Sequence, residues 1–162
     1  MLPARTTASL LVSARVPPKA EPGDHETLVL LTTRPLAAAR VAVRVPLGVI
    51  VVVRAPGKVV RRLDLRKARV ARHGSRRSLE LRVANRGNVT EELAGVHVTV
   101  SRARTGRRLA TLVAAQRDVR PHTQGILEFR LRQRLRGAVS ARVLIPASPG
   151  RTAIRRTYNL RL

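Results

Sequence analysis

Residues 77–100 read RSLELRVANRGNVTEELAGVHVTV, and they contain two stretches in which apolar residues occupy every second position. Over 79–83 Leu and Val alternate with Glu and Arg, and over 96–100 Val alternates with His and Thr. A period of two is typical of a β-strand with one buried face. Between the two stretches, 85–88 is Asn-Arg-Gly-Asn, and Gly and Asn accept left-handed backbone angles readily. These residues therefore predict two strands and a loop at the centre of an antiparallel sandwich.

The residues around this centre continue the same pattern. We predict further strands at Val59–Val70, Leu109–Val113, Ile126–Leu131, Val139–Ile145 and Ile154–Leu162. Together with Ser78–Ala84 and Val96–Arg102 they make about seven strands, the number in an immunoglobulin-like sandwich of about 100 residues. No segment longer than about ten residues keeps a helical period. The expected fold class is all-β, with an immunoglobulin-like β-sandwich at 57–162.

The first third of the chain predicts an incomplete unit of the same kind. Strands are expected at Ala8–Val16, Glu26–Thr33, Ala39–Val45 and Leu47–Arg54. About four strands are too few for a complete sandwich. The last of them begins with a continuous apolar run, as a strand buried on both faces would. We therefore expect a partial β-sandwich unit at 1–56, ending at the Ala-Pro-Gly sequence 55–57.

The charge of the chain is strongly positive and comes almost entirely from arginine. Lys and Arg number 33 against 9 Asp and Glu, which gives a formal net charge of +24. Such a field attracts nucleic acid, anionic lipid or acidic wall polymer without specificity. The alternative is an arginine-rich surface with no dedicated ligand. Arginine is densest over 58–77, and since clustered guanidinium groups bind phosphate or carboxylate bidentately, we predict anionic contacts at Arg61, Arg62, Arg66 and Arg69.

Residues that would catalyse a reaction or bind a metal are scattered along the chain. There is no Cys, and the four His do not have metal-ligand spacing. The Asp-His-Glu sequence at 24–26 is the nearest approach to a metal cluster, and no nucleophile elbow or phosphate-binding Gly-rich loop is present. We predict no catalytic residue, cofactor or metal site. The alternative is an enzyme whose His or carboxylate cluster is assembled only by folding.

Nucleic-acid recognition and membrane insertion are weakly supported. Phe129 and Tyr158 are the only aromatic residues, so a base-stacking platform is not expected. Nucleic acid would then bind only through a non-specific, salt-dependent phosphate interaction. The longest apolar run, Val45–Val53, is far shorter than the ~20 residues of a membrane helix. Met1–Val16 contains no predicted signal peptide.

Several turn and strand signatures resemble those of a known family. They are Pro-Gly-Asp-His at 22–25, Val-Ala-Val-Arg-Val at 41–45, Gly-Val-Ile-Val-Val-Val-Arg at 48–54 and Leu-Glu-Leu-Arg-Val-Ala-Asn-Arg-Gly-Asn at 79–88. Over roughly residues 8–146 the chain is similar to bacterial surface proteins with pilus-chaperone-like immunoglobulin domains, which include the peptidoglycan-binding domains of WxL-type proteins. Relative to that family the chain is expected to be truncated at both ends.

The resemblance implies a non-catalytic function outside the cell. We expect a cell-surface or cell-wall-associated module, extracellular in location, that engages anionic wall polymer, peptidoglycan or a partner protein. A strand edge left open in the partial unit would accept a partner strand or a second copy of the chain. The alternative function is that of an arginine-rich, cytoplasmic protein that binds nucleic acid non-specifically.

Overall fold

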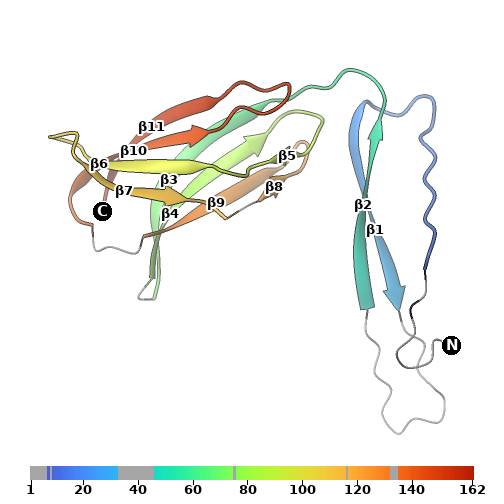
Figure 1. Ribbon diagram of the computed structural model, residues 1–162, viewed down its shortest axis with the longest axis horizontal. Coiled ribbons are helices and arrows are strands. Elements are labelled where there is room, and N and C mark those ends of the chain that lie inside the picture. Colours follow the sequence, from blue (N-terminus) through green and yellow to red (C-terminus); the bar gives the residue numbers. More distant parts are fainter. Residues whose placement is uncertain (1–6, 8, 33–45, 75, 116, 132–134) are drawn as a thin grey trace, which may run out of the picture. The chain divides into compact units, whose positions relative to one another are not determined.

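The computed structural model describes residues 7, 9–32, 46–74, 76–115, 117–131 and 135–162. These residues contain eleven β-strands and no helix, so the predicted all-β fold class is confirmed (Figure 1). The chain divides into two units, Met1–Gly57 and Lys58–Leu162. This division lies one residue from the boundary expected from the Ala-Pro-Gly sequence.

The second unit is a sandwich of two antiparallel sheets (Figure 1). The three-stranded sheet has the order β3 (Leu63–His73), β4 (Arg76–Asn85), β9 (Gln124–Leu131). The four-stranded sheet has the order β11 (Ile154–Arg161), β10 (Ala138–Ile145), β6 (His97–Arg102), β7 (Arg108–Val113). The short strands β5 (Glu91–Glu92) and β8 (Asp118–Val119) pair separately. Of the seven main strands of this unit, counted in chain order, the first, second and fifth form one sheet and the remaining four form the other. This is an immunoglobulin-like arrangement.

The two strands of the central stretch lie in different sheets. β4 is the middle strand of the three-stranded sheet, and β6 is an inner strand of the four-stranded sheet. Their apolar positions are fully buried in one shared core, where Leu81 of β4 and Val98 of β6 have no exposed surface. Phe129 of β9 is the largest fully buried side chain. Alternation therefore located the core residues correctly because each strand has one face toward the core and one toward solvent.

The loop between these strands is stabilised by two asparagine side chains. The amide nitrogen of Asn85 donates to the carbonyl oxygens of Val89 and Val119, at 2.8 and 2.9 Å. The side-chain amide of Asn88 donates to the carbonyl of Lys58 at 2.8 Å and accepts from the backbone N–H of Val60 at 2.7 Å. The loop thus holds residues 58–62, the segment that leads into β3 and that we call the entering segment. Its backbone groups need hydrogen-bond partners because they are removed from water.

Gly87 allows the closest approach of backbone to backbone in this loop. A Cβ atom at this position would lie 2.1 Å from the carbonyl oxygen of Val60. Any side chain would therefore displace the entering segment. The glycine predicted as a turn residue is required for close packing of two chain segments.

The strands described in the first unit, β1 (Gly23–Thr32) and β2 (Pro46–Ala55), form a two-stranded antiparallel sheet. The strand predicted at 8–16 is wrong for its described residues, which have no strand pairing, and the strand predicted at 39–45 lies outside the described residues. The expectation that 47–54 is buried on both faces is also wrong, because Leu47 and Ile50 are 59% and 53% exposed. Two strands alone cannot cover either face of such an apolar segment.

Candidate anion-binding face

The two sheets of the sandwich differ in where their few carboxylates lie. Each strand of the three-stranded sheet contains one, namely Asp64, Glu80 and Glu128. No Asp or Glu occurs over 93–117 or after residue 128, so the four-stranded sheet contains none. Its strands contain Arg102, Arg108, Arg142, Arg155, Arg156 and Arg161. A guanidinium group on this sheet therefore has no carboxylate neighbour on its own sheet.

The strand register brings hydroxyl groups and guanidinium groups together on the outward face. Arg142 of β10 lies opposite Thr157 of β11 and Thr99 of β6, and Thr99 lies opposite Thr111 of β7. Directly paired residues of an antiparallel sheet project to the same side. The neighbours of Arg142 along β10, Ala141 and Val143, are fully buried, so the row of Arg142 faces solvent.

A second row runs parallel to this one. Asn159 of β11 is opposite Ser140 of β10, which is opposite Ser101 of β6, and after a register shift between β6 and β7 Ser101 is opposite Arg108. Arg155 and Arg161 extend the same face along β11 by the alternation of that strand. We call the resulting surface the hydroxyl–arginine face, made of Thr99, Ser101, Arg108, Thr111, Ser140, Arg142, Arg155, Thr157, Asn159 and Arg161.

The chemistry of the hydroxyl–arginine face suits oxygen-rich anions. Guanidinium groups bind phosphate or carboxylate oxygens through paired N–H donors, and hydroxyl groups both donate and accept. Arg142, Arg155 and Arg161 are exposed. Among the described residues, none of the carboxylates forms a recorded ion pair with these three guanidinium groups. Their charge is therefore not offset by an internal ion pair.

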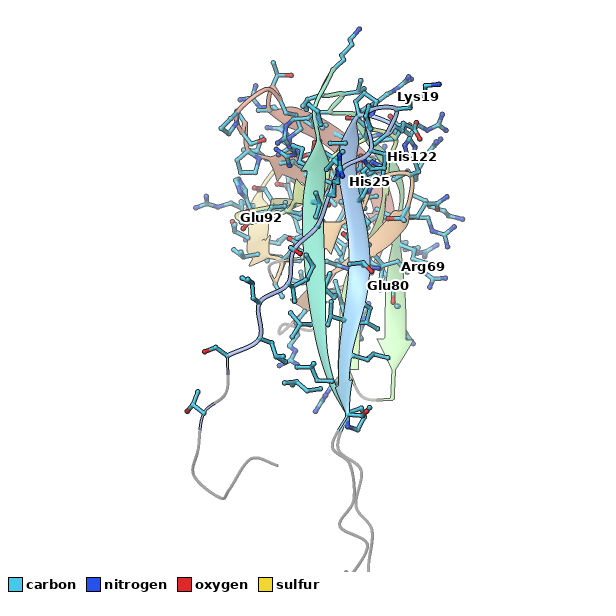
Figure 2. The ribbon with its side chains drawn as sticks, turned by 90° about the vertical axis from the view of Figure 1, so that its right-hand side faces the viewer. Lys19, His25, Arg69, Glu80, Glu92 and His122 are labelled. Carbon is cyan, nitrogen blue, oxygen red and sulfur yellow. The ribbon has the colours of Figure 1, made fainter. Side chains whose placement is uncertain are left out.

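The four arginines predicted as anionic contacts do not form one cluster. The Nε and Nη2 atoms of Arg69 both lie 2.8 Å from one carboxylate oxygen of Glu80, and the two side chains lie together in Figure 2. Arg66 lies 3.3 Å from Asp64, whose same oxygen is 2.9 Å from Arg86. These arginines are thus partly neutralised by the carboxylates of the three-stranded sheet.

Arg61 takes part in an internal ion triad. Its Nη1 atom lies 3.2 Å from one oxygen of Glu91, whose side chain is 1% exposed, and Nε of Arg151 lies 3.5 Å from the other oxygen. Arg151 also donates to the carbonyl of Pro146 at 3.0 Å. The triad joins the entering segment, β5 and the β10–β11 loop. Arg62 is exposed, and no ion pair is recorded for it within the described part of the chain.

The Asp-His-Glu sequence in β1 is not assembled as a metal site. Asp24 binds Arg54 bidentately, at 2.6 and 3.1 Å, and the resulting hydrogen bonds and charge attraction raise the pKa of the Arg54 guanidinium above its ordinary value. The ring of His25 projects to the other face and donates to the carbonyl oxygen of Glu21 at 2.7 Å. No group of three potential metal ligands occurs within the described residues.

Both aromatic residues are directed toward the core of the sandwich. Phe129 is fully buried. Tyr158 packs against the core, where burial raises the pKa of its hydroxyl group above the ordinary value. The guanidinium carbon of Arg156 lies 5.6 Å from the Tyr158 ring centre, and its Nη1 donates to the carbonyl of Leu65, which joins β11 to β3. Neither ring is therefore placed on the hydroxyl–arginine face.

Comparison with known proteins identifies no relative. No protein-family model, curated protein or solved structure matches the chain. The resemblance to bacterial surface proteins stays a prediction from the motifs. Across the described residues, no helix has the length and apolar character needed to cross a membrane.

Sequence reasoning missed the hydroxyl–arginine face because it searched for the densest run of arginines. A signal was present: residues 129–162 contain many arginines and no Asp or Glu. The absence of carboxylates over a whole sheet, rather than the local density of arginines, distinguishes this surface.

Proposed function

We propose that the protein is a non-catalytic, cell-surface or cell-wall-associated module that binds anionic wall polymer through the hydroxyl–arginine face. The observation that supports the proposal most directly is the four-stranded sheet with arginines and no carboxylate. The rest of the sandwich positions this sheet and offsets part of its own charge through ion pairs.

The shape of the face suits an extended polymer. Neighbouring strands lie about 4.8 Å apart, so four strands present a surface about 14 Å wide between the outer strands. Arg142 and the three threonines of its row cross the full width. A polymer with repeated phosphate or carboxylate groups would contact several donors at once, and its sugar or polyol hydroxyls would bond with Thr and Ser.

Nucleic acid is the less favoured ligand. Single strands are held in binding channels by aromatic stacking as well as by charge, and here Phe129 is buried in the core and Tyr158 packs against it. Binding that depends on phosphate contacts alone weakens steeply as the salt concentration rises, so we expect it to be weak at physiological salt. Duplex DNA is therefore the competitor to include in a test.

The test is co-sedimentation of the full chain with isolated bacterial cell walls, at about 0.15 M salt, where the Debye length is about 8 Å. We expect pelleting that excess duplex DNA does not abolish. The double variant Arg142→Glu/Arg155→Glu should lose most of the pelleting. The matched control Arg62→Glu/Arg82→Glu makes the same change of charge on exposed arginines near or on the three-stranded sheet and should keep it.

Two results would contradict the proposal. If both double variants lose pelleting equally, total charge alone explains the binding. If DNA removes the wild-type chain from the walls, the protein binds polyanions in general and has no preference for the wall polymer.

A further inference from the structure

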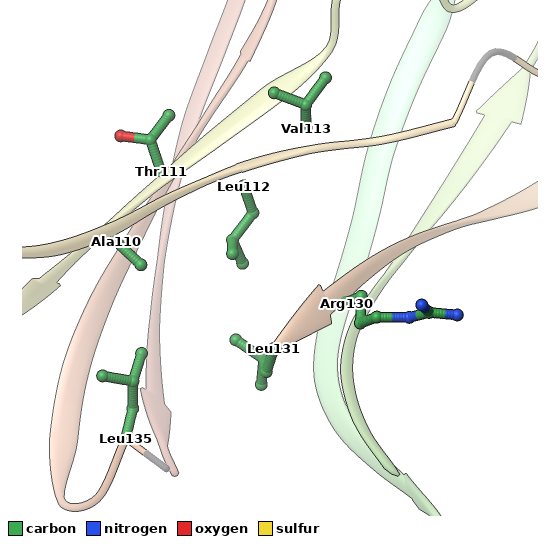
Figure 3. A pocket seen from close by; sticks show the side chains of 7 residues that line it. All are labelled: Ala110, Thr111, Leu112, Val113, Arg130, Leu131 and Leu135. Carbon is green, nitrogen blue, oxygen red and sulfur yellow. The ribbon is translucent and has the colours of Figure 1, made fainter. Parts of the chain in front are cut away.

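A hollow of about 440 Å³ lies along one side of the sandwich, between β7 and β9 (Figure 3). Its apolar wall is formed by Ala110 and Leu112 of β7 together with Leu131 and Leu135, all of which are only partly buried. Arg130 of β9 is the charged residue of the lining. This hollow, which we call the β7–β9 groove, meets the hydroxyl–arginine face at Thr111, which belongs to both.

The groove exists because two sheet edges meet there. β7 is the last strand of the four-stranded sheet and β9 the last strand of the three-stranded sheet. On one side of an edge strand, the backbone N–H and C=O groups of alternate residues have no strand partner. On the opposite side of the sandwich, Arg156 of β11 bonds to the backbone of β3. The sandwich is thus bridged along one side and hollowed along the other.

Cations border the groove. Arg130 is among the lining residues, and Arg77 donates from Nη1 to the carbonyl of Leu135, another lining residue, at 3.0 Å. The Nε–H of Arg77 is buried and has no hydrogen-bond partner among the described residues. None of the described residues that line the groove is a carboxylate, and the nearest one along β9 is Glu128, which projects to the same side of the strand as Arg130. The neighbourhood of the groove therefore favours an anionic occupant.

We infer that the β7–β9 groove binds an extended segment of a partner protein, in which apolar residues alternate with polar residues and carboxylates. The segment would pair its backbone with the open edge of β7. Its apolar side chains would lie on Ala110, Leu112 and Leu131, and its carboxylates would meet Arg77 and Arg130 at the rim. Strand addition of this type takes affinity from the backbone pairing and specificity from alternate side chains.

The charge of the groove favours a partner protein over this chain's own unpaired segment. Residues 9–16 are described without strand pairing and alternate in apolar character, but their only charged residue is Arg15. A second copy that inserted this segment would bring a cation to a cationic rim. The occupant is therefore expected to come from an acidic chain.

The experiment uses the full chain and two pools of synthetic ten-residue peptides. In one pool Val, Ile and Leu alternate with Thr, Ser and Glu, and in the other Lys replaces Glu. We expect the Glu pool to be retained at least tenfold more than the Lys pool at about 0.15 M salt, where long-range attraction is screened. Hydrogen exchange of the complex should slow at the amides of β7.

The substitution Ala110→Leu separates this inference from the proposed function. It fills the groove without changing the charge, so it should abolish peptide retention and leave wall pelleting unchanged. Arg142→Glu should have the opposite pattern. Circular dichroism and thermal unfolding of both variants would establish that each is folded.

The inference is overturned by any of three results. The Glu pool is not retained above the Lys pool, or Ala110→Leu retains it as well as the wild-type chain does. The slowed amides lie outside β7, for example in β1 or β2. The groove is occupied by a second copy, shown by a concentration-dependent dimer that Ala110→Leu abolishes.

Discussion

The three-stranded and four-stranded sheets of the sandwich both carry arginines on their outward surfaces, but they have opposite electrostatic arrangements. On the three-stranded sheet Glu80 and Asp64 bind guanidinium groups at 2.8 to 3.3 Å. On the four-stranded sheet no carboxylate is present, and threonines flank Arg142. In a chain with so large an excess of arginine, the positions of the few carboxylates decide where charge remains for a ligand.

The largest effect is expected from Glu91, whose side chain is 1% exposed. Glu91→Gln would leave Arg61 and Arg151 without their shared anion, and breaking a buried ion cluster in this way costs about 3–5 kcal/mol. The midpoint of urea unfolding should fall with little change in slope. Glu92→Gln, a change at the exposed neighbour, is the control and should alter the midpoint far less.

If Glu91→Gln unfolds at the wild-type urea concentration, the triad contributes no net stability. Glu91 would then contribute no more to stability than an exposed carboxylate does.

The next largest effect is on ligand binding. Arg142→Glu/Arg155→Glu should reduce affinity for purified wall polymer at least tenfold, about 1.4 kcal/mol or more. Isothermal titration calorimetry at about 0.15 M salt measures this. An equal loss in the control Arg62→Glu/Arg82→Glu would remove the distinction between the two sheets.

A smaller change gives the four-stranded sheet its first carboxylate. Thr99→Glu places an acid directly opposite Arg142, in the position that Glu80 has relative to Arg69 on the other sheet. We expect affinity for the polymer to fall about fivefold, about 1 kcal/mol. Thr99→Gln has a similar size and no charge, and it should bind within twofold of the wild-type chain. Equal losses in both variants would attribute the effect to size rather than charge.

The smallest effect is expected for the ion pair of Arg69 and Glu80. The side chain of Arg69 is 61% exposed, so solvent screens the pair, and a double-mutant cycle should give a coupling of about 0.5 kcal/mol. The cycle uses Arg69→Gln, Glu80→Gln and both together, measured by urea unfolding. A coupling above about 2 kcal/mol would contradict the view that this surface is an ordinary solvated one.

Much of the sandwich could be predicted from sequence because its strands have one buried face. Val139, Ala141 and Val143 alternate with Ser140 and Arg142, and the structure buries the first set completely. The first unit was harder to predict. The run from Leu47 to Val53 has the composition of a strand buried on both faces, but burial depends on neighbours that a local pattern does not specify.

The candidate site required the register between strands. Arg142, Thr99 and Thr157 are far apart in the sequence, and only pairing of β10 with β6 and β11 places them in one row. Likewise, the contact of Arg61 with Glu91 spans a loop whose path depends on Gly87 and Asn88. Arginine density along the chain could therefore suggest anion binding in general but could not point to the four-stranded sheet.

The most direct test of the central claim is to map the polymer contact by NMR. Backbone amide shifts of the full chain would be followed during titration with purified anionic wall polymer at about 0.15 M salt. We predict the largest shifts at Thr99, Thr111, Arg142 and Thr157, on the outward face of the four-stranded sheet. Largest shifts at Arg66, Arg69 and Arg82, or equal shifts on both sheets, would contradict the assignment of binding to the carboxylate-free sheet.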